Sequence, residues 1–176
     1  MLNSLDDSNA SHCRAKAILL LAAVYGLRRC EITRLTLDDF DWYNEVLTVR
    51  RAKRGRLQQF PLQFEVGEAI IRYLRNVRPP SKSRRLFLTL QVPYRPAENI
   101  GPAMRRILNA QGLSALPCGL HSLRHACATE LLRQGTSLRG IADFLGHRSI
   151  RSVSIYARCD LRALRKVADL SLQGVL

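Results

Sequence analysis

The sequence lacks the usual features of secreted and membrane proteins. Its five cysteines are odd in number and form no CxxC pair, so we expect reduced thiols rather than a disulfide framework. No apolar run approaches the roughly 18 residues that cross a bilayer, and the N-terminus has no basic segment followed by an apolar core. These absences predict a soluble, cytoplasmic protein.

Acidic residues and lysines are also scarce. Only 14 residues are acidic against 28 basic ones, and the formal charge of +14 predicts a polyanionic partner, most naturally nucleic acid. Four of the 28 are lysines and the other 24 are arginines, whose planar fork makes paired hydrogen bonds to phosphate. A GC-rich genome would produce the same excess of arginine, so the skew alone does not establish phosphate recognition.

The length of the chain predicts one domain over residues 1–176. Its periodicity predicts an α+β fold, mostly helical, with a small antiparallel sheet of about three strands on one side. Residues 15–25 are apolar on nearly every side, which predicts a buried helix that Gly26 ends in a left-handed conformation. A short helix carrying Glu31 follows, and residues 65–77 have the pattern of an amphipathic helix.

Two further patterns predict strands. Residues 46–62 read as a hairpin, because VLTV and LQQFPL flank the basic turn RRAKRGR, which places Lys53 near the tip. Residues 85–90 are the candidate third strand. From residue 99 onward the pattern is helical, with breaks at Gly135 and Gly146.

Two arginines are candidates for holding a phosphate. Cleavage of a phosphodiester builds negative charge on its oxygens, so the site needs cationic donors aimed at them. Arg28 in GLRRCE and Arg124 in HSLRH can each donate two parallel hydrogen bonds and stay protonated at physiological pH. Either could be a solvated surface residue, but each lies within a distinct motif, which favours the clamp.

Tyr156 is the candidate nucleophile, since a phosphotyrosine ester preserves the energy of the broken bond for rejoining. The pKa of a phenol is about 10 in water, so the tyrosine needs a proton acceptor or a cationic environment. His121 and His147 can supply both, one as the general base and the other as a hydrogen-bond donor to the phosphate.

Lys53 is the candidate general acid for the departing 5′ oxygen, because arginine, with a pKa above about 12, is a poor proton donor. One more phosphate contact is the alternative role for this lysine. Four neighbouring arginines are expected to contact the DNA backbone and to lower the lysine pKa: Arg50, Arg51, Arg54 and Arg56.

A metal site is the less favoured interpretation of the histidines. His121 and His125 lie four residues apart on one helix face, as in HExxH zinc sites, but Ser122 replaces the glutamate. Adding Cys118 gives three ligands and no clear fourth. We therefore expect no metal, and His125 is interpreted as a packed residue behind the site.

Four blocks in this order resemble the catalytic domain of the tyrosine recombinases, the phage integrase family. They are GLRxxE at 26–31, a lysine in a basic hairpin that ends in Pro-Leu, HxLRHxxAT at 121–129, and LGHxSI at 145–150 followed by IY at 155–156. The resemblance covers almost the whole chain. It implies DNA integration or recombination through a 3′-phosphotyrosyl intermediate, without metal, ATP or another cofactor, at the prokaryotic nucleoid, and it implies that Glu31 orients the reacting groups.

The resemblance also implies a homotetramer on double-stranded DNA, in which a C-terminal helix docks into a neighbouring protomer. Periodicity does not decide whether this helix packs in cis or in trans. Family members usually carry an N-terminal core-binding domain, for which the 27 residues before Arg28 leave no room, so we expect that domain to be absent, either because the sequence is an excised catalytic domain or because the protein is a minimal recombinase. Arg29, where an uncharged residue is usual, and RSVS before Ile155 also depart from the pattern.

Two other functions stay open on the sequence. A DNA-binding or regulatory module of the same fold would lack productive catalysis and would form no covalent adduct. A type IB topoisomerase would share the chemistry, but it would relax supercoiled DNA as a monomer without site preference.

Overall fold

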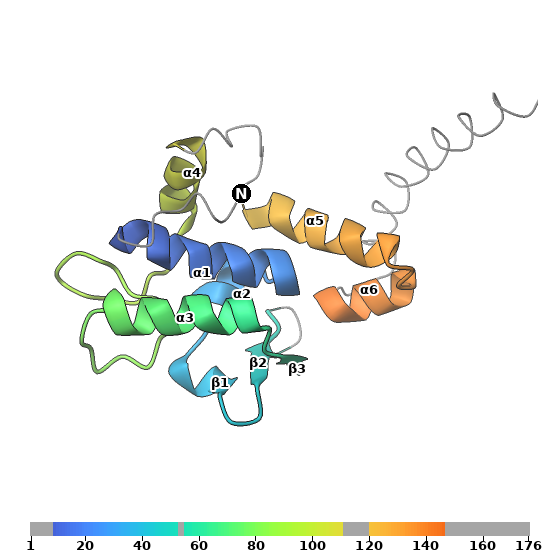
Figure 1. The fold of residues 1–176 in the computed structure, drawn as a ribbon, viewed down its shortest axis with the longest axis horizontal. Coiled ribbons are helices and arrows are strands. Elements are labelled where there is room, and N and C mark those ends of the chain that lie inside the picture. The colour runs from blue at the N-terminus through green and yellow to red at the C-terminus, as the bar shows by residue number, and fades with distance from the viewer. Residues whose placement is uncertain (1–8, 53–54, 111–119, 147–176) are drawn as a thin grey trace, which may run out of the picture. The chain divides into compact units, whose positions relative to one another are not determined.

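The computed structural model describes residues 9–52, 55–110 and 120–146 (Figure 1). The chain divides into two compact units, Met1–Arg124 and His125–Leu176. The long helix α5 (Leu120–Arg133) begins in the first unit and continues into the second. None of the described helices is long and apolar enough to cross a membrane.

Helix α1 (Ala10–Tyr25) forms the centre of the first unit. The Asn9 side chain caps it by accepting hydrogen bonds from the amides of Ser11 and His12, and Gly26 ends it at a φ of 58°. α1 lies alongside α3 (Phe64–Asn76), as Figure 1 shows. Its buried side chains cover nearly all sides: Cys13, Ala15, Ala17, Ile18, Leu19, Leu20, Leu21, Ala22 and Tyr25. The predicted buried helix and its glycine cap are confirmed.

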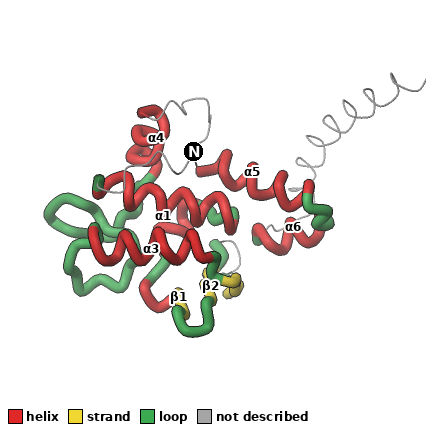
Figure 2. Tube along the Cα trace, in the orientation of Figure 1, coloured by secondary structure: helices red, strands yellow, loops and turns green. Residues whose placement is uncertain are grey.

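A three-stranded antiparallel sheet follows the short helix α2 (Arg29–Arg34) and a single 3-10 turn at Leu37–Asp39. Its strands, in spatial order, are β1 (Phe40–Asp41), β2 (Val46–Arg50) and β3 (Leu57–Pro61). β2 and β3 pair from Val46 with Pro61 to Arg50 with Leu57, which confirms the predicted hairpin. Figure 2 shows how small the sheet is beside the helices, so the predicted mostly helical α+β class is confirmed as well.

The prediction that residues 85–90 form the third strand is wrong, because β1 takes that place. Arg85 and Leu88 make only isolated bridges, to Thr36 and Pro96. Three consecutive residues of the segment, 86–88, are fully buried, so one face of a sheet could not accommodate them. Their backbone groups instead bond to other parts of the first unit, including the Tyr73 hydroxyl.

The remaining described elements are α4 (Gly101–Ala110) in the first unit and α6 (Leu138–Leu145) in the second. Within the second unit, α6 packs on the C-terminal part of α5 through a small apolar cluster. The predicted breaks at Gly135 and Gly146 are confirmed, since both have positive φ, 82° and 62°. The cluster consists of Cys127, Ala128, Ile141, Ala142 and Leu145.

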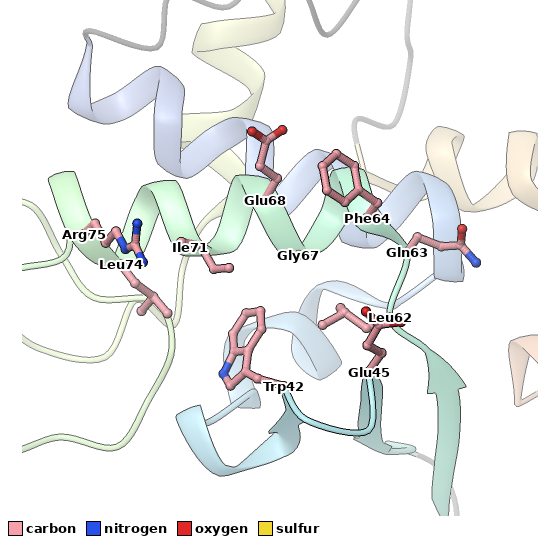
Figure 3. A pocket seen from close by; sticks show the side chains of 10 residues that line it. All are labelled: Trp42, Glu45, Leu62, Gln63, Phe64, Gly67, Glu68, Ile71, Leu74 and Arg75. Carbon is pink, nitrogen blue, oxygen red and sulfur yellow. The ribbon is translucent and has the colours of Figure 1, made fainter.

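A groove of about 540 Å³ lies between α3 and the turn that joins β1 to β2. Figure 3 shows Trp42, Leu62 and Glu45 facing the underside of α3. Among the candidate strand-cleavage residues that the structure describes, Arg28, His121 and Arg124, none lines the groove. Its lining is Trp42, Glu45, Leu62, Gln63, Phe64, Gly67, Glu68, Ile71, Leu74 and Arg75.

Candidate active site

Arg28 lies in the turn between α1 and α2, where it is the residue that precedes the first turn of α2. The left-handed conformation of Gly26 turns the chain out of α1, and Leu27 is fully buried beside it. The Arg28 side chain therefore projects from this backbone turn. Its side chain is 20% exposed, which leaves part of the guanidinium accessible to a phosphate.

Arg124 reaches the same turn from α5. Its side chain is buried, and its Nη1 donates a hydrogen bond to the carbonyl oxygen of Gly26, two residues before Arg28. The guanidinium has five N–H donors in a fixed plane, so a carbonyl on one of them sets the direction of the others. The structure thus brings the motifs around residues 28 and 124 together at one backbone turn.

The buried Glu31 carboxylate accepts hydrogen bonds from Arg28 and from the segment that follows β2. Its Oε1 accepts from Arg28 Nη1 at 2.9 Å and from the amide of Ala52 at 3.1 Å. Its Oε2 accepts from the amide of Arg28 at 2.9 Å and from Arg51 Nη1 at 3.0 Å. The carboxylate therefore links the α2 terminus to the end of β2, one residue before Lys53.

Burial by itself would raise the pKa of the Glu31 carboxyl. The amide of Arg28, the Arg51 guanidinium, the amide of Ala52 and the Arg28 charge act in the opposite direction and together lower this pKa below its ordinary value. Glu31 is therefore ionised at neutral pH, as an acceptor of four donors requires.

Arg51 does not lie where the sequence prediction put it. Instead of facing a DNA backbone it is 3% exposed, with its Nε 2.7 Å from the Gln58 side-chain oxygen and its guanidinium carbon 5.2 Å from the centre of the Phe60 ring. The reason is strand periodicity: Leu47 and Val49 face the interior, and the next position on that side is 51. Arg51 is therefore no longer a candidate for contact with the DNA backbone.

Two of the other hairpin arginines, Arg50 and Arg56, are exposed as a backbone contact requires. Lys53 and Arg54 lie outside the described residues, as do His147, Tyr156 and Cys118. Their roles stay predictions from the sequence.

His121 is exposed in the first turn of α5. It lies three residues before Arg124, so the two side chains share a face of the helix. His125 is half-buried, and its carbonyl accepts the Thr129 hydroxyl at 3.0 Å. Within the described ranges, no group of three or more histidine, cysteine, aspartate or glutamate residues is placed to hold a metal ion.

Two of the other tyrosines are structural. Tyr25 Oη donates to the Pro61 carbonyl at 3.0 Å and accepts from the Gln63 amide at 2.8 Å, which ties the end of α1 to the end of β3. Tyr73 Oη accepts from the Leu88 amide at 3.1 Å. Burial raises the pKa of both phenols, which makes them poor nucleophiles.

Sequence reasoning missed the parts played by Tyr25, Gln58 and the Ala52 amide. For Tyr25 the signal was present, because it sits on the buried face at the end of an apolar helix. For Gln58 and Ala52 no sequence signal exists, since their partners depend on the register of the hairpin.

The sequence model of the protein family described as "Phage integrase family" matches residues 1–162. The protein y4gC of Sinorhizobium fredii, named an integrase/recombinase, is 39% identical over 175 residues, which cover 99% of this chain and 91% of that protein. A second such protein of the same organism, y4rA, is 42% identical over 171 residues, but these cover 96% of this chain and only 41% of y4rA.

Among solved structures, that of the XerA recombinase matches with a TM-score of 0.76 and 26% identity, over 97% of this chain and 62% of that one. The XerH site-specific recombinase matches with a TM-score of 0.75 and 24% identity, over 95% of this chain and 48% of that one, which shows a shared fold. The chain thus spans about half the length of several relatives and nearly all of y4gC.

Proposed function

Because the chain belongs to the phage integrase family, we propose that it is a site-specific DNA recombinase that cuts and rejoins strands through a 3′-phosphotyrosyl intermediate. The observation that carries this proposal is the junction at Gly26, where Arg124 bonds to the turn that presents Arg28. Two cationic groups held at one rigid turn are what the charge on a cleaving phosphodiester requires.

The candidate residues can together carry out each step of the reaction. The Tyr156 oxygen attacks the phosphorus while His121 accepts the phenolic proton, and the bond to the 5′ oxygen breaks. Lys53 protonates the departing 5′ oxygen, Arg28 and Arg124 bind the phosphate oxygens, and His147 donates to one of them. Rejoining is the reverse step with the 5′-hydroxyl of a partner strand. One ester bond replaces another, so no ATP is consumed, and these groups need no metal ion to act.

Double-stranded DNA is the proposed partner. The formal charge of +14 and the exposed Arg50 and Arg56 beside the hairpin turn support it. The XerH structure is a complex with palindromic difH substrate, and one Tn1549 integrase structure is a complex with circular intermediate DNA. By analogy with the family, we further propose that the protein assembles as a homotetramer on DNA through its C-terminal segment and acts in the cytoplasm.

Covalent trapping tests the proposal. The protein is incubated with nicked suicide duplexes of randomised sequence, denatured, and examined for a DNA-linked band. We expect a band that Tyr156→Phe abolishes and that Tyr43→Phe retains, since Tyr43 is 95% exposed and serves as the matched control. DNA binding without any adduct would instead favour a non-catalytic module or a fragment that needs a further domain, and relaxation of supercoiled DNA by a monomer would identify a topoisomerase.

A further inference from the structure

The buried cluster at the end of β2 contains two arginines and one carboxylate. Arg28 and Arg51 both donate to Glu31, at 2.9 and 3.0 Å, and they reach different oxygens of its carboxylate. Among the described ion pairs, only these two share an acidic residue. The formal charge of the cluster is therefore +1 rather than zero.

The two arginines differ in what they can reach. The Arg51 side chain is 4% exposed, against 20% for Arg28. Gln58 and the Phe60 ring hold the Arg51 guanidinium on its other sides, so it cannot turn outward to a phosphate. Its ion pair with Glu31 is the contact through which Arg51 is placed to act on DNA.

Charge balance shows what that effect is. The negative charge of a buried carboxylate with a single cationic partner offsets most of that partner's charge, because little solvent lies between the two groups to screen their interaction. If Arg28 were that single partner, its field on a phosphate would be largely cancelled. A second buried cation on the opposite oxygen removes this competition.

We propose that Arg51 is a positioning residue whose charge balances Glu31, so that Glu31 can orient Arg28 without neutralising it. The inference rests on the proposed function in one respect, the contact of Arg28 with a DNA phosphate. Arg51 itself touches no substrate.

The test measures how DNA affinity depends on salt, which needs neither cleavage nor a known target site. Affinity for a short random-sequence duplex is measured over a range of salt concentrations. Each phosphate contact contributes about 0.9 to the slope of log K against log [salt]. We expect Arg28→Met and Arg51→Met each to reduce the slope by about 0.9, although Arg51 is buried.

Three further variants separate charge from packing. Arg51→Lys keeps the charge but loses the fork, so the slope should stay that of the parent protein. Gln58→Met removes a neutral partner of Arg51 without changing any charge, so it should lower the melting temperature and leave the slope unchanged. In the double variant Glu31→Gln/Arg51→Met the competing negative charge is absent, so the slope should return to that of the parent protein.

An undiminished slope in folded Arg51→Met, beside a reduced slope in Arg28→Met, would overturn the inference. So would an undiminished slope in Arg28→Met. If Arg51→Met does not fold, Glu31→Gln decides: an unchanged slope supports the inference, and a rise of about 0.9 overturns it, because Glu31 would then already cancel Arg28. The trapping experiment tests the proposed function separately. If no adduct forms but the salt slopes of the variants are as expected, the result contradicts the proposed catalysis and leaves the role of Arg51 supported.

Discussion

Arg124 and Gly26 lie 98 positions apart in the sequence and are joined by a hydrogen bond from the guanidinium to the glycine carbonyl. The bond places one candidate phosphate ligand against the backbone turn that presents the other. The geometry of the site therefore depends on the conformation of Gly26 as well as on the two arginines.

Replacing Arg124 by lysine should reduce the rate of adduct formation by about 10²- to 10³-fold, the usual cost of losing one donor to a developing oxyanion. Lysine is a point charge and cannot hold the Gly26 carbonyl and a phosphate in one plane. Single-turnover trapping measures the rate. Arg133→Lys is the matched control, because Arg133 lies on the same helix, is exposed, and pairs with Glu130 at the surface. Equal rates for the two variants would contradict the assignment of Arg124.

Gly26→Ala should destabilise the protein by about 1–2 kcal/mol, since a side chain at a φ of 58° is strained. It should also reduce trapping, because relaxing this turn displaces Arg28. Gly135→Ala imposes a similar strain at a φ of 82° with no atom within 4 Å of the added methyl. Urea denaturation should show comparable losses for the two variants, and only Gly26→Ala should slow trapping. Normal trapping by Gly26→Ala would show that the turn tolerates the change.

The lowered pKa of Glu31 predicts a specific acid dependence of stability. The folded pKa lies below the unfolded value of about 4.3, so the ionised carboxylate contributes its full stabilisation above that pH. The contribution should be lost as pH falls through the folded pKa. The difference in unfolding free energy between the parent protein and Glu31→Gln should therefore be constant near neutrality and shrink below about pH 4.3. A difference that does not change with pH would contradict the shift.

Tyr25→Phe should cost about 1–3 kcal/mol, because it leaves the Pro61 carbonyl and the Gln63 amide without their shared partner. Urea denaturation measures the cost, and Tyr43→Phe on the surface should show none. Adduct formation should survive in Tyr25→Phe, in contrast to Tyr156→Phe. Loss of the adduct with stability intact would give Tyr25 a role in the chemistry.

The sequence predicted those parts of the fold whose period is visible along the chain. The apolar helix ended by Gly26, the hairpin and the amphipathic helix α3 are local patterns, and each is present in the structure. The third strand was misplaced because residues 86–88 are β-prone and buried, yet their backbone partners come from elsewhere in the first unit. The β-propensity of a segment does not specify which other segment its backbone pairs with.

The same limit applies to the site. The motifs identified Arg28, Arg124 and Glu31, but a row of arginines in a hairpin turn looks uniformly solvent-exposed until the strand register is known. Counting two positions on from Val49 would have placed Arg51 inside. That Ala52 donates to Glu31 follows only from the three-dimensional path of the chain.

The four bonds to Glu31 also bear on the hydrogen exchange of two segments. The backbone amides of Arg28 and Ala52, which belong to different elements, both end on this one carboxylate. Neither amide hydrogen can exchange with solvent deuterium by that route until its bond to Glu31 opens, and the buried carboxylate has no exposed position to which it could shift. Replacing Glu31 should therefore lower the hydrogen-exchange protection of both amides, the one before α2 and the one after β2.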